Sequence, residues 1–170
     1  MSDSYDDGLR DTAVILGSTG HEDLGGDGEL HAVWVKRMRR GPMDRADSAV
    51  IRAGSGIVGN ANQGGQRQVT LMELEAWDGF MRRLGASLPT SARRANLVVR
   101  SIRLRNRRGH LLRIGVCRIR IFGETKPCER MDEPLSGLRR IMWANWGGGA
   151  LGEVLDDGRI SVGDPVSWIE

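Results

Sequence analysis

The feature of this sequence that most constrains its fold is a succession of short stretches in which apolar and polar residues alternate. Residues 116–122 show it best: Cys117, Ile119 and Ile121 share one face of an extended chain, and two arginines share the other. Each such strand has to bury its apolar face, so many short strands predict a closed, mainly antiparallel β-barrel with one or two inserted helices. The other strands are expected at residues 30–36, 48–52, 96–99, 101–104, 110–114, 152–155, 159–162 and 166–168.

Helical spacing occurs in two parts of the sequence. Thr70 and Glu73 stand in a capping-box pattern, and apolar residues at 71, 74, 77, 81 and 84 predict a helix that starts at this cap. Gly85 is placed to end that helix in a left-handed conformation. Apolar residues between 135 and 142 predict a second, shorter helix. The Asp-Gly pair at 157–158 predicts a hairpin turn between the two strands that flank it.

Charge divides the chain into two parts. Residues 1–29 are polar and Gly-rich and carry eight acidic side chains against Arg10, so we interpret them as a mostly disordered acidic arm. Residues 30–170 are assigned to the folded domain. All but two of the 25 basic side chains in the sequence are arginine, and a basic body of this kind attracts anions, phosphate in particular. A genome biased toward arginine codons would produce the same count.

Several classes of protein are excluded by composition. No apolar run approaches the ~20 residues that cross a bilayer, and the first residues have neither the basic start nor the apolar core of a signal peptide. We therefore expect a cytoplasmic protein that does not contact a membrane. Two cysteines are too few for a secreted disulfide framework, so both are expected to be free. The three histidines are scattered, which is not the pattern of a zinc site.

Residues 54–59 match the G-x-G-x-x-G pattern of dinucleotide-binding proteins letter for letter. That pattern needs a helix directly after it, whereas residues 60–65 are turn formers, so we reject a dinucleotide site. Arg67 follows this loop and precedes the predicted helix, a position from which it could hold a phosphate or a carboxylate. An ordinary loop with a surface arginine is the alternative.

Seven arginines lie between Arg103 and Arg120, several of them on the outward face of a strand. They form either a solvated face or a binding surface for nucleic acid or another polyanion. The stretch has no interleaved aromatic residues that could stack on bases, so nucleic acid is not expected as a partner.

The two cysteines have different surroundings in the sequence. Cys117 lies on the apolar face of its strand and is expected to be a small buried side chain. Cys128 follows Pro127, and Lys126 and Arg130 stand close to it. Positive neighbours favour the thiolate, which is both the nucleophilic form and the form that binds soft metals. Residue chemistry alone leaves sulfur chemistry and metal binding open for Cys128.

Six short segments, taken in order, resemble the MOSC family, the domain named for the C-terminal part of molybdenum-cofactor sulfurases. The chain is similar to a stand-alone, bacterial-type member, and the resemblance runs from about residue 30 to residue 166. In two positions it departs from the family pattern: Asn60 stands where aspartate usually follows a glycine, and Ala95 replaces a common glutamate or arginine. The matching segments are Lys36-Arg37, Gly56-Ile57-Val58-Gly59-Asn60, Arg67-Gln68-Val69-Thr70-Leu71, Arg94-Ala95-Asn96-Leu97-Val98-Val99, Pro127-Cys128 and Gly163-Asp164-Pro165-Val166.

The resemblance implies a small β-barrel like the inserted domain of pyruvate kinase, with the Pro-Cys pair in its pocket. It also implies that the protein binds the molybdenum cofactor (molybdopterin), with Cys128 as catalytic residue and molybdenum ligand. Such relatives are oxidoreductases that reduce small N-hydroxylated substrates, for example amidoximes and hydroxylaminopurines. By position, the cofactor-binding residues would be Lys36, Arg67, Arg94, Asn96, Thr125 and Lys126.

Two further hypotheses remain beside the oxidoreductase. In one, Cys128 is the site of a sulfur carrier that holds a persulfide and receives its sulfur from a cysteine desulfurase. In the other, the protein is a non-catalytic β-barrel that binds a polyanion through the arginines of residues 103–120. The oxidoreductase needs an external electron donor, because no haem, flavin or zinc site is expected in this chain.

Overall fold

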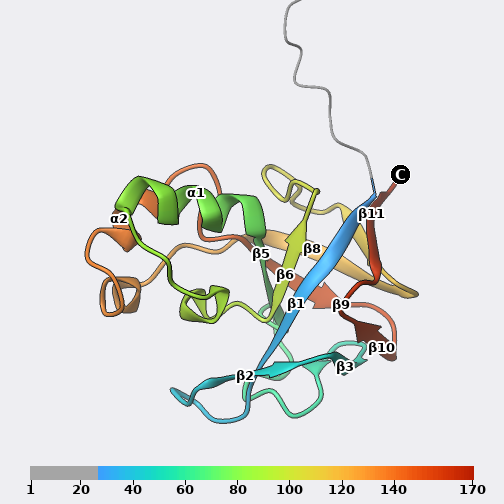
Figure 1. Ribbon diagram of the computed structural model, residues 1–170. Helices are drawn as coiled ribbons and strands as arrows, with labels where there is room; N and C mark the ends of the chain where they lie inside the picture. Colours follow the sequence, from blue (N-terminus) through green and yellow to red (C-terminus); the bar gives the residue numbers. More distant parts are fainter. Residues whose placement is uncertain (1–26) are drawn as a thin grey trace, which may run out of the picture.

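The computed structural model describes residues 27–170. The predicted acidic arm therefore lies almost entirely outside the described residues, but Gly28 and Glu29 at its end belong to the first strand, β1 (Gly28–Lys36). Figure 1 shows a β-barrel with the helices on one side and with the C-terminus beside the start of β1. The predicted fold class is confirmed. No helix within residues 27–170 is both long and apolar enough to cross a membrane.

Seven strands close the barrel in the described part of the chain, in the order β1, β11, β7, β8, β9, β5, β6 and back to β1. All neighbouring pairs are antiparallel except β5 and β6, which run parallel. The strands of the barrel after β1 are β5 (Val69–Glu73), β6 (Leu97–Arg100), β7 (Leu111–Ile114), β8 (Cys117–Glu124), β9 (Ala150–Val154) and β11 (Pro165–Ile169).

Four short strands of the described residues lie outside this ring. The strand β2 (Met43–Ala46) pairs with the end of β1. The other three form a separate sheet in the order β10, β3, β4. Their bounds are Ser48–Arg52 for β3, Gly56–Ile57 for β4 and Gly158–Ser161 for β10.

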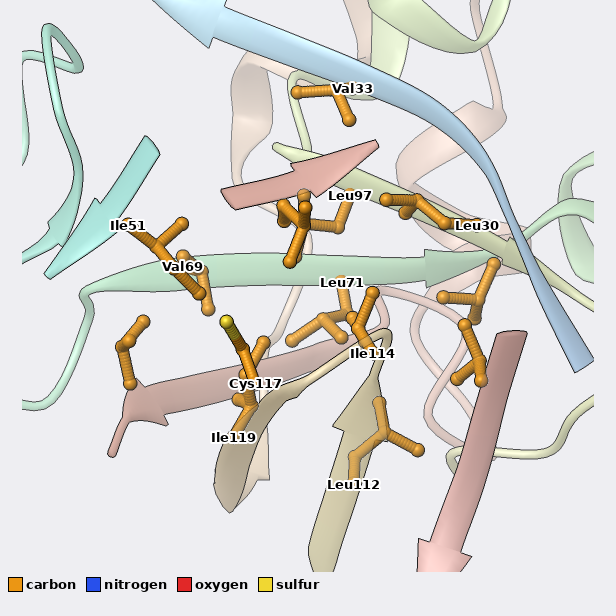
Figure 2. Packing of buried hydrophobic residues seen from close by; sticks show 14 of the residues in the cluster. Leu30, Val33, Ile51, Val69, Leu71, Leu97, Leu112, Ile114, Cys117 and Ile119 are labelled. Carbon is orange, nitrogen blue, oxygen red and sulfur yellow. The ribbon is translucent and has the colours of Figure 1, made fainter. Parts of the chain in front are cut away.

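Side chains from alternate strand positions fill the barrel. In β8, Cys117, Ile119 and Ile121 are fully buried, while the arginines between them are exposed. Figure 2 shows the Cys117 sulfur among apolar side chains of the core. Burial raises the pKa of the Cys117 thiol, so this group stays protonated and unreactive at neutral pH. The prediction that Cys117 is a structural side chain is confirmed.

The first helix, α1 (Leu74–Leu84), begins after the predicted cap, because residues Val69–Glu73 form β5 instead. Glu73 makes no side-chain capping bond. The Thr70 hydroxyl accepts a hydrogen bond from the Asn96 N–H (3.0 Å), and Glu73 Oε1 accepts one from the Leu104 N–H (2.6 Å). The predicted capping box is wrong because tertiary contacts use both of its side chains.

The C-terminal end of α1 and the second helix agree with the prediction. Gly85 has a φ of 61°, and the chain leaves the helix there in the left-handed conformation. The second helix is α2 (Leu138–Met142). Residues 101–104, expected as a strand, form none, because the N–H groups of Ser101 and Leu104 donate to the carboxylates of Glu75 and Glu73 instead of to a neighbouring strand.

The predicted hairpin at Asp157-Gly158 is also wrong. The strand before it, β9, already pairs with β5 on one edge and β8 on the other, so it has no free edge. The strand after it, β10, pairs with β3 instead. The Asp157 carboxylate supports this crossing by accepting a hydrogen bond from the Ala53 N–H (2.8 Å).

Both helices cover one outer face of the barrel (Figure 1). The outward-facing Ala32, Met72 and Val98 of β1, β5 and β6 form a second apolar cluster with residues of α1 and α2. Trp77 of α1 is fully inside this layer, and its indole N–H donates to the Leu88 carbonyl (3.0 Å). The layer ends near the starts of β5 and β6, where the outward positions become polar.

Candidate functional site

A basic cavity of about 190 Å³ lies against the outer wall of the barrel, where the apolar layer ends. Lys36, Thr70 and Asn96 face it from the end of β1, from β5 and from the residue before β6. Each of them lies an even number of positions from the outward-facing apolar residue of its own strand (Ala32, Met72 or Val98). Because side chains of a strand alternate between its two faces, all three point to this outer side. The whole lining consists of Lys36, Asn60, Asn62, Arg67, Thr70, Arg93, Arg94, Asn96, Thr125, Lys126, Cys128, Arg130 and Met131.

Three loops supply the rest of the wall. The loop after β4 brings Asn60 and Arg67, and the short 3₁₀ helix Thr90–Arg93 brings a pair of arginines. The segment after β8 brings Thr125 and Cys128. Residues from four separate stretches of the chain (36, 60–70, 93–96 and 125–131) therefore meet in one cavity that includes all seven residues expected from the family resemblance. Their roles as ligands stay predictions.

A hydrogen-bond network fixes the polar residues at the back of the basic cavity. The Asn96 side chain accepts from the Thr70 N–H and hydroxyl (both 3.2 Å) and donates to the Trp34 carbonyl (3.1 Å) and Asn60 Oδ1 (3.2 Å). Asn60 Oδ1 also accepts from the Lys36 N–H (2.9 Å). Because these bonds occupy the Asn96 amide, its main role in this geometry is to join three strands and position Lys36.

Arg93 is the most buried charge of the basic cavity and was not among the expected site residues. It is 8% exposed, and its Nε donates to the Gly148 carbonyl (3.0 Å), to which its Nη2 is also bound. Burial lowers the pKa of Arg93 to about 10, an effect that the charge of a Cys128 thiolate opposes. A buried cation that has no acidic partner in the described chain gains from an anion beside it, so this part of the cavity favours a negatively charged ligand.

Other cations of the basic cavity repel one another. Burial lowers the pKa of Lys36, and the nearby Arg94 and Arg130 lower it further. Burial also lowers the pKa of Arg94, whose Nη2 donates to the Gly41 carbonyl (2.7 Å). Among residues 27–170, no carboxylate and no histidine lines this cavity. An anion bound here would relieve the repulsion among these groups.

Cys128 is exposed at the edge of the basic cavity. Its neighbour Lys126 points its ammonium group to Glu124 Oε1 (2.8 Å) and the Trp143 carbonyl (3.0 Å). The positive charge that faces Cys128 therefore comes chiefly from Arg93 and Arg94, both of which interact electrostatically with it. The sequence shows that Lys126 stands next to the thiol, but only the structure shows that its charge is already paired with Glu124.

Three consecutive glycines shape the wall behind Arg93. A Cβ added to Gly148 would overlap the Thr125 carbonyl oxygen, and one added to Gly149 would overlap the Leu71 carbonyl oxygen. Only glycine allows backbone segments this close, and the close approach exposes the Gly148 carbonyl to Arg93. These glycines therefore serve close backbone contact.

Two other sequence features lie outside this cavity. Residues 54–59 run through β4 into a turn, and no helix follows them, which agrees with the rejection of a dinucleotide site. Arg118 and Arg120 of the arginine stretch form ion pairs with Asp156 (2.9 Å) and Glu153 (3.2 Å) on the outer surface of the barrel.

Comparison with known proteins identifies the fold. A family model described as the MOSC domain matches residues 29–167, which is most of the chain. The chain belongs to the MOSC domain family. This result bears out the resemblance seen in the sequence, and the family is associated with the molybdenum cofactor.

Three solved structures share the MOSC fold with this chain. The YuaD protein from Bacillus subtilis has a TM-score of 0.73 at 16% identity, over 83% of this chain and 94% of its own. YiiM from Geobacillus stearothermophilus has 0.70 at 14% identity, over 84% and 75%. YiiM from Escherichia coli has 0.65 at 16% identity, over 84% and 70%. A comparison with curated protein sequences found no match.

The cofactor-binding residues expected from the sequence did not include Arg93, Arg130 or Thr70 of this MOSC cavity, although Arg130 was recognised as a positive neighbour of Cys128. The signal for Arg93 was present, because it forms a pair with Arg94. Arg94 has a φ of 64°, and the left-handed turn there sends the two side chains to different parts of the wall. A sharp turn of this kind at a residue other than glycine cannot be read from the sequence.

Proposed function

We propose that this MOSC protein binds the molybdenum cofactor in the basic cavity, with the Cys128 sulfur as molybdenum ligand, and that it reduces small N-hydroxylated or related substrates. The observation that carries the proposal is that the described residues around a single cavity include six cationic side chains, no carboxylate and one exposed thiol. A molybdopterin carries a phosphate and a metal that accepts sulfur ligands, so its two ends match the two kinds of donor.

The residues present fit this group in charge and in chemistry. The Lys36 ammonium and the Arg67 guanidinium have no hydrogen-bond or ion-pair partner within residues 27–170, so both are available for a phosphate. Arg93 and Arg94 have backbone carbonyls as partners and keep their charge uncompensated. The enclosed volume, about 190 Å³, is below the ~300 Å³ of common ligand pockets. A group as large as a pterin would therefore extend beyond the cavity over its exposed edge.

The chain's own residues would bind, orient and supply a proton, while the cofactor would supply the redox chemistry when bound. Reduction of an N-hydroxylated substrate consumes two electrons and two protons and releases water. The electrons would come from an external donor in the cytoplasm. If the arginines alone hold the phosphate, Lys36 Nζ is the candidate proton donor, because its lowered pKa makes the ammonium group more acidic than that of an ordinary lysine.

A sulfur carrier is the second candidate for the same site. The exposure of Cys128 supports it, since a desulfurase has to reach the thiol in order to transfer a sulfur atom to it. In that case Cys128 would hold the persulfide, and the surrounding cations would stabilise its negative charge.

Metal and pterin analysis of the purified protein tests the first proposal. We expect molybdenum and an oxidisable pterin in protein made in a host that produces the cofactor, with loss of the metal in Cys128→Ser and weaker cofactor retention in Arg67→Ala. Arg113→Ala, an exposed arginine on β7 outside the cavity, is the matched control. Protein with neither molybdenum nor pterin would overturn the proposal.

Mass spectrometry separates the two candidates. After incubation with a cysteine desulfurase and cysteine, a sulfur carrier gains the mass of one sulfur atom at Cys128. An unmodified Cys128 after this treatment would count against the carrier.

Polyanion binding by residues 103–120 remains a third, weaker proposal, since part of that surface is occupied by ion pairs. Binding of a polyanion that does not weaken as salt rises would remove it.

A further inference from the structure

A second cavity lies at the other end of the parallel pair β5 and β6. It encloses about 700 Å³, within the size range of sites for small organic molecules, and shares no lining residue with the basic cavity. Thr70 lines the basic cavity and Glu73 lines this one, so β5 separates them by three residues, roughly 10 Å. We refer to it as the large cavity.

One side of the large cavity is apolar and partly aromatic. Phe80 comes from α1, Ile141 from α2, and Ile102 from the segment after β6. The Trp146 side chain completes this wall from the loop before β9. Ile141 and Trp146 are partly exposed, while Phe80 and Ile102 are buried, so Ile141 and the Trp146 ring form the apolar surface open to a flat ligand.

The rim of the large cavity carries four arginines, Arg83, Arg103, Arg105 and Arg140. None of them forms a salt bridge within residues 27–170, whereas some arginines elsewhere on the surface do pair with acids, for example Arg37 with Asp44.

Two carboxylates also line the large cavity, but backbone donors already bind them. Glu73 Oε1 accepts from the Leu104 N–H (2.6 Å), and Glu75 Oε1 accepts from the Ser101 N–H (2.7 Å). These bonds hold the acids at the base of the loop that carries two of the arginines. The rim therefore has more positive charge than its own acids neutralise.

The loop that presents Trp146 has an unusual backbone. Asn145 and Trp146 have φ values of 56° and 61°, so two consecutive residues other than glycine adopt the left-handed conformation. This conformation is costly for a bulky side chain, and such residues are concentrated at binding sites. The Trp146 N–H is anchored to Glu124 Oε1 (3.2 Å), which fixes the loop against the barrel.

We propose that the large cavity is a binding site for a small organic anion with an aromatic body and a carboxylate, phosphate or sulfonate group. The aromatic body packs against Trp146 and Ile141, and the anionic group binds the arginines of the rim, among them Arg103 and Arg140. The site is separate from the basic cavity and does not depend on the function proposed for it.

A pair of matched fluorescent probes tests this inference on the full-length chain. The first is 8-anilinonaphthalene-1-sulfonate, and the second is N-phenyl-1-naphthylamine, which has the same rings without the sulfonate. We expect saturable binding of the sulfonate probe at one site per chain. The neutral probe should bind about tenfold more weakly, because it lacks the charged hydrogen bonds between the sulfonate and the arginines, which contribute about that factor to the affinity. Several weak sites, or equal affinity for both probes, would contradict the proposal.

Substitutions locate the probe. The double variant Arg103→Gln with Arg140→Gln should weaken sulfonate binding about tenfold, and the matched control Arg113→Gln should change it less than about twofold. Ala144→Phe, at an exposed position of the cavity wall, should block the probe without disturbing the core. Far-UV circular dichroism and thermal unfolding confirm that each variant is folded. Unchanged affinity in both cavity variants would overturn the proposal.

Two further variants test whether the probe binds elsewhere or competes with the N-terminal segment. Arg67→Ala, in the basic cavity, should leave the affinity unchanged, and a loss of binding there would assign the probe to the basic cavity instead. Replacement of Asp3, Asp6, Asp7 and Asp11 by asparagine in the full chain should also leave it unchanged. A large gain of affinity in that variant would make the acidic N-terminal segment the natural occupant and contradict the small-anion site.

Discussion

Replacement of Asn96 by alanine distinguishes a structural role of this residue from a role as cofactor ligand. Its side chain makes four hydrogen bonds, to Thr70, Trp34 and Asn60, and only 6% of it is exposed. Asn96→Ala leaves the Thr70 N–H and the Trp34 carbonyl without this partner. Each buried group that loses its partner costs about 1–3 kcal/mol, so we expect a loss of about 2–5 kcal/mol of unfolding free energy.

The assay is thermal unfolding of the purified protein without added cofactor. For a chain of this length, 1 kcal/mol shifts Tm by roughly 2–4 °C, so Asn96→Ala should lower Tm by roughly 5–15 °C. The matched control is Asn62→Ala, because Asn62 also lines the basic cavity, is exposed, and contributes only its backbone carbonyl to the network. Substitutions at such surface positions change stability by about 0.5 kcal/mol or less.

A Tm for Asn96→Ala equal to that of Asn62→Ala would refute this reasoning. In that case the hydrogen bonds of Asn96 would contribute nothing net to the fold, and its side chain would be free to bind a ligand. If instead the variant is destabilised and still retains any bound cofactor, Asn96 is a positioning residue, as the geometry indicates.

Three other perturbations follow from the same structure. Cys128→Ser should leave Tm within about 1 °C while it removes bound metal or persulfide, since the thiol is exposed; unfolding of the variant would mean that Cys128 is structural. Gly148→Ala should lower the unfolding free energy by about 1–3 kcal/mol, because the new Cβ overlaps the Thr125 carbonyl, and urea unfolding measures it; an unchanged midpoint would show that the loop adapts freely. Burial raises the pKa of Glu73 above its ordinary 4.5, so the native state holds this proton more tightly than the unfolded state, and the stability contributed by Glu73 is lost as pH rises from 4.5 through the raised value. Glu73→Gln should therefore flatten the decline of unfolding free energy over that pH range, and an identical pH profile would contradict the assignment.

The relation between sequence and structure is clearest in β8. Its alternation determined which residues face inward, because the side-chain period of a strand is two whatever the strand pairs with. The same local rule placed Cys117 in the core and, by contrast, left Cys128 as the exposed thiol. The position of Gly85 was also readable, since the left-handed end of a helix depends on a backbone freedom that glycine has.

The sequence could not decide which partners the polar side chains would find. Thr70 and Glu73 have the spacing of a helix cap, but their partners Asn96 and Leu104 lie 26 and 31 positions further along the chain. Asp157 and Gly158 have the composition of a hairpin turn, yet β9 has no free edge for β10 once β5 and β8 are paired with it. In both places the residues have the composition of the predicted cap or turn, but they make their hydrogen bonds or strand pairing with distant parts of the chain instead.

For the site, the sequence determined which residues are available and the tertiary structure determined what each of them does. The family pattern selected Cys128 and six polar residues. Folding brings them to one cavity, because alternation sends Lys36 and Asn96 to the same outer face and loops carry the other five to it. Only the folded chain shows that Lys126 is paired with Glu124 and that Asn96 is used within the wall. Only the fold makes Arg93 a buried cation without an acidic partner among residues 27–170, because burial depends on the glycine loop that closes over it from 55 positions away.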